Sequence, residues 1–259
     1  MIMQNEKLLD IRNVCMYFGG VHAVEGMNIQ MDNDEILGII GPNGSGKSTL
    51  INVLTGVYKP TAGEVFFNGQ NITGLKQHKI AELGIARTFQ NLRVFTAMTV
   101  RDNVVTGNHI NIRAGFVDSL LHTRKFKNDE ARAKKEAEEL LEFVGLADMK
   151  NEIAGSMAYG QQKRLEIARA LASKPKLCLL DEPAAGMNSA EALEMMEVIK
   201  RVQRERGIGV ILIEHNMEAM MTTANRIIVM DAGKEIAEGS PAEVQSNPLV
   251  IKVYIGEDD

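Results

Sequence analysis

Short apolar runs separated by turn residues dominate the first ninety residues, and this pattern predicts strands and turns around one helix. The run Glu64 to Phe67 is followed by Asn68-Gly69, a dipeptide typical of a hairpin turn. One helix is predicted from Lys47 to Thr55, ended by Gly56. The longer apolar runs are divided by glycines or polar residues and cover 8–18, 21–31 and 35–40.

Between residues 88 and 160 the chain becomes charged and its pattern becomes helical. The clearest helix is predicted from Asn128 to Val144, where apolar side chains recur at the spacing of one helix face, namely Ala137, Leu140, Leu141 and Val144. Gly145 is expected to end it. We interpret this stretch as an inserted helical lobe, in which residues 107–127 have the weakest pattern.

After Gly160 helical and strand patterns alternate, which favours a mostly parallel sheet with crossover helices. Helices are predicted over 162–172, over 189–206 and from residue 217, and strands over 177–180, 209–213, 226–230 and 235–238. The expected fold class is therefore α/β, with an antiparallel β portion at the N-terminus. The expected division is a core of 1–88 and 161–240, a helical subdomain of 89–160 and a C-terminal appendage of 241–259.

The amino-acid composition limits the classes of function that are expected for this chain. The 259 residues carry a formal net charge of -5, so no broad positive field is available for nucleic acid. The two cysteines, Cys15 and Cys178, lie in apolar runs and are expected to be reduced and buried, as in a cytosolic protein. We find neither a run long enough to cross a bilayer nor a signal peptide near the first residue, so any membrane role is expected to be peripheral.

A complete phosphate-binding loop lies between an apolar strand and a helix. Its glycines allow backbone N–H groups to surround phosphates, Lys47 reaches the outer phosphates, and the Ser48 hydroxyl binds Mg²⁺. The N-terminal end of the following helix adds positive potential. The residues expected to contact ATP here are Gly41, Pro42, Asn43, Gly44, Ser45, Gly46, Lys47, Ser48 and Thr49.

A second candidate segment is the apolar strand Leu177 to Leu180, which ends in Asp181 and Glu182. This is the arrangement of a Walker B segment, in which Asp181 holds Mg²⁺ through water and Glu182 polarises the attacking water. By itself the segment also fits a strand followed by an acidic helix cap. Its occurrence in the same chain as a phosphate-binding loop favours catalysis.

Three groups of residues before, at and after the second motif occur together and in order, and with the phosphate-binding loop they resemble an ABC ATPase. They are Gln161-Gln162-Lys163-Arg164-Leu165 before the strand, Asp181-Glu182-Pro183 at its end and Glu214-His215 after the next one. The resemblance covers nearly the whole chain. It separates this protein from GTPases and small-molecule kinases, which share only the phosphate-binding loop, and we find no acceptor pocket or base-recognition loop typical of them.

The resemblance implies a signature segment at 157–161, which contacts the γ-phosphate held by a partner subunit through Tyr159, Gly160 and Gln161. Here Ala158 and Tyr159 replace the serine and glycine of the commoner Leu-Ser-Gly-Gly-Gln. The contact must then depend on the Gly160 backbone and the helix N-terminus. The alternative is that Gly160 only caps the helix.

The resemblance also assigns three single residues. Gln90 matches the glutamine that contacts Mg²⁺ and water, and His215 matches the histidine that hydrogen-bonds the γ-phosphate. Phe18 matches the aromatic residue that stacks on adenine, although Tyr17 is adjacent and strand register decides between them. Asn188 stands where an aspartate is usual, and Asn188 with Glu191 also reads as a helix capping box.

The residues that make up these motifs are similar to those of the longer ATP-binding subunit of bacterial branched-chain amino-acid importers. That resemblance implies an ATPase dimer, heterodimeric or alternatively homodimeric, on the cytoplasmic face of the plasma membrane. It also implies two permease subunits, which are contacted around Gln90 to Val104. The competing hypothesis is a soluble ABC ATPase of repair or translation, but such proteins usually carry two cassettes or a long coiled-coil insert. Neither is present in this sequence.

Overall fold

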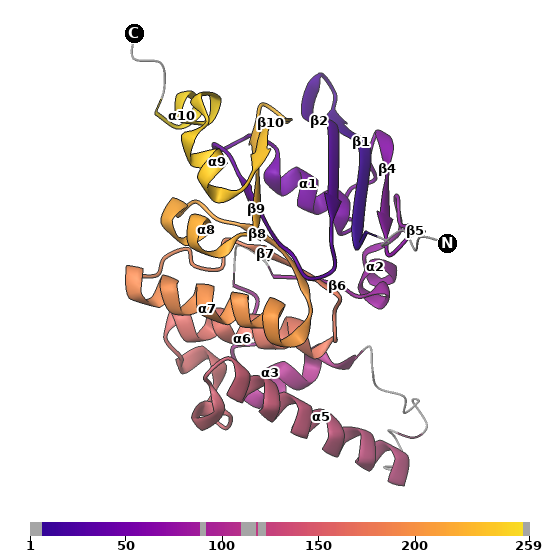
Figure 1. Ribbon diagram of the computed structural model, residues 1–259. Helices are drawn as coiled ribbons and strands as arrows, with labels where there is room; N and C mark the ends of the chain where they lie inside the picture. The colour runs from indigo at the N-terminus through magenta and orange to yellow at the C-terminus, as the bar shows by residue number, and fades with distance from the viewer. Residues whose placement is uncertain (1–6, 89–91, 110–117, 119–122, 256–259) are drawn as a thin grey trace, which may run out of the picture.

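The computed structural model describes residues 7–88, 92–109, 118 and 123–255 (Figure 1). One sheet is antiparallel and has the strand order β2-β1-β4-β5. Its turns need left-handed backbone, which Gly19, Asn68 and Gly69 supply with φ of 58°, 48° and 73°. The predicted N-terminal β portion and its hairpin are confirmed. The strands are β1 (Leu9–Phe18), β2 (Val21–Met31), β4 (Ala62–Phe67) and β5 (Gln70–Asn71).

The second sheet has six strands in the order β10-β9-β3-β8-β7-β6. Every pairing between β9 and β6 is parallel, and only the edge strand β10 runs antiparallel to its neighbour. This confirms the mostly parallel sheet. The strands are β3 (Ile36–Ile40), β6 (Ile85–Arg87), β7 (Leu177–Asp181), β8 (Gly209–Ile213), β9 (Arg226–Asp231) and β10 (Lys234–Gly239).

The six-stranded sheet separates two hydrophobic cores because successive side chains on a strand point to opposite faces. Leu37 and Ile39 of β3 pack toward the antiparallel sheet and α1 (Lys47–Leu54). Ile36 and Ile40 pack on the other face, among the larger helices. The strand that precedes the phosphate-binding loop is therefore fixed from both sides.

Helices cover the face of the six-stranded sheet to which Ile36 and Ile40 point, and they extend beyond the sheet, as Figure 1 shows for α3, α5, α6 and α7. Helix α3 packs against both α5 and α6. The approach of α3 to α6 is close, because a Cβ atom on Gly107 would lie 2.1 Å from the Arg169 carbonyl oxygen. The helices are α2 (Gln77–Leu83), α3 (Val100–Gly107), α5 (Arg124–Phe143), α6 (Tyr159–Ala172), α7 (Ser189–Arg206), α8 (Met217–Thr223), α9 (Pro241–Ser246) and α10 (Pro248–Ile255).

Two helices begin earlier than predicted, and local hydrogen bonds explain both differences. Helix α5 begins at Arg124 rather than Asn128 because the Thr123 hydroxyl accepts the Phe126 N–H at 3.3 Å. Helix α6 begins at Tyr159 rather than Gln162 because the Gln161 side chain accepts the Ala158 N–H at 3.0 Å.

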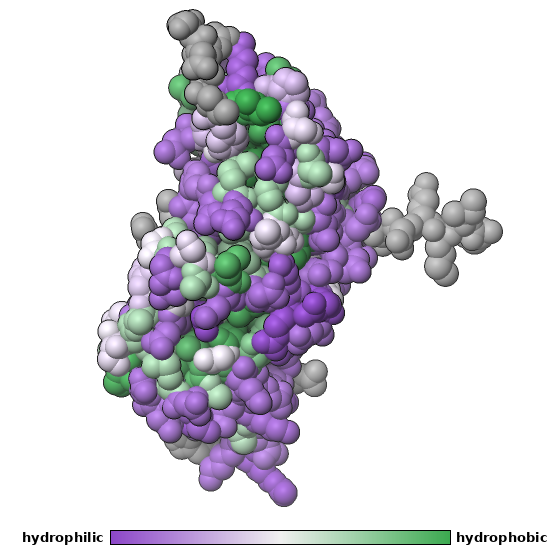
Figure 2. All heavy atoms as spheres, turned by 60° about the vertical axis from the view of Figure 1, so that its left-hand side comes forward, coloured by the Kyte–Doolittle hydropathy of each residue, from purple (hydrophilic) through white to green (hydrophobic). Residues whose placement is uncertain are grey.

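The C-terminal helices α9 and α10 are anchored by Val244 and Val250, which are buried. Helix α10 also exposes Leu249, Ile251 and Tyr254. Figure 2 shows a hydrophobic patch at this end of the molecule, beside the grey C-terminal atoms, on a face that is otherwise mostly hydrophilic.

Both cysteines are buried and free, as the sequence predicts, and this has a measurable consequence. Burial raises the pKa of the Cys178 thiol to about 12. Its thiolate, the reactive form, is therefore nearly absent at pH 8. We expect Ellman's reagent to label neither cysteine in native protein and both in denaturant. Rapid labelling of native protein at pH 8 would contradict this packing.

Candidate functional site

The candidate site forms where three neighbouring parallel strands end. Ile39 of β3 pairs with Ile213 of β8, and Ile213 pairs in turn with Asp181 of β7. The segments after these three strands therefore start at one edge of the sheet, which is where open α/β folds bind ligands. These segments carry the phosphate-binding loop, the carboxylates Asp181 and Glu182, and the pair Glu214-His215.

Gly46 enables the phosphate-binding loop to close onto α1. It is the N-cap of the helix, with φ of 102°, and a Cβ atom there would lie 2.3 Å from the Ala23 carbonyl oxygen. Gly44, with φ of 82°, faces open space instead. The loop thus packs tightly on one side and leaves its other side accessible to a ligand.

We expect Gly46→Ala to disrupt the loop. The left-handed backbone alone costs a side chain about 1–3 kcal/mol, and the contact with Ala23 adds to this. The free energy of unfolding in urea should fall by at least that amount, with loss of ATP binding. Gly20→Ala is the matched control, because Gly20 has open space around it and lies in the β1–β2 turn. Unchanged stability of Gly46→Ala would contradict the loop geometry.

Lys47 is buried, and its ammonium group is held by its own loop. The Nζ atom donates to the carbonyl oxygens of Gly41 at 2.8 Å and Pro42 at 2.9 Å. Burial lowers the pKa of Lys47, while the negative charges of Glu182 and Asp181 act in the opposite direction. The site therefore places one cation between two carboxylates and the phosphate-binding loop.

Glu182 and His215 meet directly, because the Glu182 Oε1 atom lies 2.8 Å from His215 Nε2. Glu182 has a left-handed backbone with φ of 51°, and its N–H donates to the Ile213 carbonyl oxygen at 2.9 Å. Such a backbone is unfavourable for a glutamate and is found most often at functional sites. The strained turn directs Glu182 toward the segment after β8.

Three further residues support this arrangement, and the sequence did not assign them a role. Buried Glu214 accepts the Ala184 N–H at 2.7 Å and so holds the segment after Glu182. Burial raises the pKa of Glu214. The Thr88 hydroxyl accepts the Asp181 N–H at 3.4 Å, and Arg87 forms an ion pair with the Asp181 carboxylate at 3.1 Å. Glu214 belongs to the Glu214-His215 pair of the family resemblance, and only their position just before Gln90 could have indicated Arg87 and Thr88.

Some of the residues that are expected to bind nucleotide come together around one cavity. A cavity of 500 Å³ is lined by residues of the phosphate-binding loop together with Glu182 and His215. The β1–β2 hairpin contributes Val21, His22 and Ala23, and Ala232 completes the lining; the sequence did not indicate any of these four. The members from the loop and α1 are Asn43, Gly44, Gly46, Lys47, Ser48 and Thr49.

The assignment of Phe18 to adenine stays a prediction. Phe18 is exposed at the end of β1, and its ring meets the edge of Tyr58 with centroids 5.2 Å apart. Tyr17 instead stacks on His22, at 4.1 Å between centroids, and His22 lines the cavity.

The signature segment lies apart from this cavity, at the start of α6. The Tyr159 ring is exposed and approaches Gly186, where a Cβ atom would lie 3.4 Å from it. Asn188 and Glu191 form the predicted capping box, with hydrogen bonds of 3.0 and 3.1 Å. The signature segment and the start of α7 thus share one surface. Gln90 lies outside the described residues.

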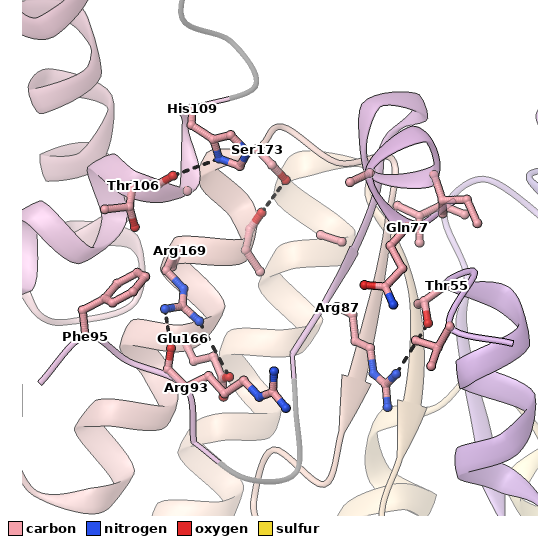
Figure 3. Close-up of a pocket in the computed structure, with 17 residues that line it drawn as sticks. Thr55, Gln77, Arg87, Arg93, Phe95, Thr106, His109, Glu166, Arg169 and Ser173 are labelled. Atoms are coloured by element: carbon pink, nitrogen blue, oxygen red, sulfur yellow. Dashed lines mark hydrogen bonds and ion pairs between the residues drawn. The ribbon is translucent and has the colours of Figure 1, made fainter. Parts of the chain in front are cut away.

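A second cavity of 590 Å³ lies on another part of the molecule (Figure 3). Its walls come from α2, β6, α3 and α6, and several arginines surround its apolar lining. The guanidinium of Arg169 lies 5.4 Å from the centre of the Phe95 ring and donates to the Arg93 carbonyl oxygen. Arg169 thus ties the segment that follows Gln90 to α6.

Two features are absent from the described part of the chain. Among these residues, no cluster of three or more His, Cys, Asp or Glu side chains is arranged to hold a metal ion. None of the helices in the same part has both the length and the apolar character that a membrane span requires.

This fold and site define a P-loop ATPase with an inserted helical region, and comparison with known families agrees. The family described as "ABC transporter" matches residues 24–185. The chain belongs to the ABC transporter family, as its nucleotide-binding ATPase component. A further family, described as "Branched-chain amino acid ATP-binding cassette transporter", matches residues 234–259.

Known proteins similar over nearly the whole length include the high-affinity branched-chain amino acid transport ATP-binding protein BraF of Pseudomonas aeruginosa. It is 41% identical over 250 residues, which are 96% of this chain and 98% of BraF. The structure of the ADP conformation of MJ1267, an ATP-binding cassette of an ABC transporter, is 34% identical with a TM-score of 0.84, covering 97% of this chain and 99% of that one. A dimeric post-hydrolysis state of the cassette MJ0796, bound to ADP and Pi, is 26% identical with a TM-score of 0.76, covering 90% and 98%.

Proposed function

We propose that this chain hydrolyses ATP to drive import of branched-chain amino acids through separate permease subunits. The observation that carries the ATPase chemistry is the meeting of Lys47, Glu182 and His215 around one cavity beside the phosphate-binding loop. The cargo is supported by the match of residues 234–259 and by the printed name of BraF.

In the proposed reaction, the loop N–H groups and Lys47 hold the phosphates. Glu182 accepts a proton from the attacking water as general base. His215, whose Nε2 atom lies 2.8 Å from Glu182 Oε1, would exchange that contact for one with the γ-phosphate and donate to it as charge develops.

Mg²⁺ is the metal that fits this site. The donors available are one hydroxyl, Ser48, and one carboxylate, Asp181, with Gln90 as the further ligand that the family resemblance implies. So small a set suits Mg²⁺, which takes its remaining ligands from water and from substrate phosphates. When bound, it would neutralise charge on the phosphates. We assign Ser48 and Asp181 to hold it.

We further propose that two ATPase subunits bind head to tail, each signature segment facing the partner's phosphate-binding loop. Tyr159, Gly160 and Gln161 lie outside the cavity of their own chain, which supports a contact with another subunit. The dimeric structure of the MJ0796 cassette, bound to ADP and Pi, supports a dimer of two such subunits. A heterodimer with a second ATPase is the form we favour, and a homodimer is the alternative.

The 590 Å³ cavity is the proposed site for a cytoplasmic helix of the permease, and it includes Arg93 and Phe95 of the expected surface from Gln90 to Val104. It is lined by core residues of α2, β6 and α6 and by residues of the helical subdomain, among them Phe95 and Thr106, so an inserted helix would contact both parts at once. The division we propose is a core of 1–88 and 161–240, a helical subdomain of 89–160 and an appendage of 241–259. Helix α6 contacts β6, which precedes the boundary at residue 88, and α3, which follows it.

Phe95 offers a direct test of this contact. Its ring is 49% exposed and lines the cavity. Loss of an aromatic anchor typically costs an interface about 2 kcal/mol, or roughly thirtyfold in affinity. We expect Phe95→Ala to reduce permease recovery in a pull-down while the isolated chain still binds ATP. Leu193→Ala, at a 48% exposed position on α7, is the control. Equal recovery by both variants would contradict the docking site.

We place the assembly at the cytoplasmic face of the plasma membrane, with no insertion of this chain into the bilayer and no nucleic-acid partner. ATP supply and the two reduced cysteines support this location. The test is to capture tagged Glu182→Gln from solubilised membranes with ATP present and to identify what copurifies. A second ATPase with two hydrophobic permeases supports the proposal. Recovery with ribosomal or DNA-repair proteins would instead support a soluble ABC ATPase.

A further inference from the structure

Arg87, the last residue of β6, binds the carboxylate to which we assign Mg²⁺. Its Nη2 atom lies 3.1 Å from Asp181 Oδ2, and the two side chains are only 12% and 8% exposed. Strand pairing fixes the approach, because Arg87 lies opposite Leu179 in the register of β6 with β7. A buried ion pair of this kind depends strongly on its geometry.

The second arm of the same guanidinium reaches the helix that carries the phosphate-binding residues. Its Nη1 atom donates to Asn52 Oδ1 at 2.7 Å. The same atom lies 3.5 Å from Thr55 Oγ1, a contact drawn in Figure 3. Both belong to the α1 segment, which Lys47 and Ser48 begin. Arg87 therefore connects Asp181 to the element that carries Ser48.

We propose that Arg87 is a positioning residue for Asp181. It fixes the rotation of the buried carboxylate through Oδ2, so that the carboxylate and Ser48 would face the same Mg²⁺. A lysine would keep the charge but could not reproduce the planar fork that spans Asp181 and Asn52. This inference rests on the proposed function, which assigns Asp181 to the metal.

The test measures how strongly Mg²⁺ improves nucleotide binding. A fluorescent ATP analogue is titrated in excess Mg²⁺ and in EDTA, in the Glu182→Gln background to prevent hydrolysis. The metal ratio is the dissociation constant in EDTA divided by the dissociation constant in Mg²⁺. We expect Arg87→Lys to lower this ratio about tenfold, as loss of a charge-assisted contact allows, while affinity in EDTA stays within about twofold. Asn52→Ala, which removes only the α1 side, should lower it about threefold.

Two controls separate positioning from general damage. Arg226 forms comparable partly buried contacts with Glu35 on the same sheet, so Arg226→Lys should leave the metal ratio unchanged. In an Asp181→Asn background, Arg87→Lys should have no further effect, because the two residues act as one unit.

The outcomes distinguish this inference from the proposed function. If the metal ratio is well above one in the parent protein and unchanged in Arg87→Lys, the role of Arg87 alone is overturned. A rise in the ratio would also overturn it, because Arg87 would then act only as a competing charge. A parent ratio near one would remove the proposed metal role of Asp181 itself, and absence of nucleotide binding would reject the proposed ATPase site.

Discussion

Glu182→Gln is expected to bind ATP with near-normal affinity and to hydrolyse it about 10²- to 10⁴-fold more slowly, the usual cost of removing a general base. Glutamine has nearly the same shape but cannot accept the proton of the attacking water. Since Glu182 contacts His215 at 2.8 Å within the phosphate cavity, the defect should be confined to chemistry. Phosphate release and fluorescent-nucleotide binding, measured on one preparation, separate the two steps.

Glu205→Gln is the control for this experiment. Glu205 is paired with Arg201 near the end of α7 and lines neither cavity described above, so its hydrolysis rate should match that of the parent protein. If Glu182→Gln hydrolysed ATP at a near-normal rate, another group would have to activate the water and the assignment of Glu182 would be wrong.

Lys47→Met is expected to weaken ATP binding about 10- to 100-fold. Methionine keeps the length of the side chain but removes the ammonium group, and a hydrogen bond to a charged group is worth about 1.5–3 kcal/mol. The Nζ atom now bonds the Gly41 and Pro42 carbonyl oxygens at 2.8 and 2.9 Å, so it is already positioned beside the loop. Hydrolysis at a fixed, subsaturating ATP concentration should fall further than binding.

Lys79→Met removes an exposed lysine paired with Glu82 and should change neither quantity. Thermal unfolding of Lys47→Met identifies any collapse of the loop, since burial already disfavours the charged ammonium and the variant should remain folded. ATP affinity equal to that of the parent protein would show that Lys47 does not bind the phosphates.

The sequence predicts the parts of this site that are contiguous in the chain. The phosphate-binding loop, the strand before Asp181 and the helix over 189–206 depend on neighbouring residues, and their glycines, apolar runs and caps are readable locally. Helix α7 begins at Ser189 and ends at Arg206 as predicted, because Asn188 and Glu191 cap its start and Gly207 its end.

Contacts between distant segments could not be predicted in the same way. Arg87 and Asp181 are 94 residues apart and meet only because β6 pairs with β7, an order that periodicity does not reveal. The support of Ala184 by Glu214 depends likewise on the adjacency of β7 and β8. The choice between Tyr17 and Phe18 depended on register, and β1 contains irregularities near Tyr17 that alternation cannot anticipate.

The central claim is tested most directly by uptake of radiolabelled leucine in cells that lack this chain. Uptake should be lost in the deletion strain, restored by the parent protein and not restored by Glu182→Gln produced at the same level. Isoleucine and valine should compete with leucine in the restored strain. Leucine uptake that is unaffected by the deletion, or fully restored by Glu182→Gln, would contradict the account of this chain as the ATP-hydrolysing component of a branched-chain amino-acid importer.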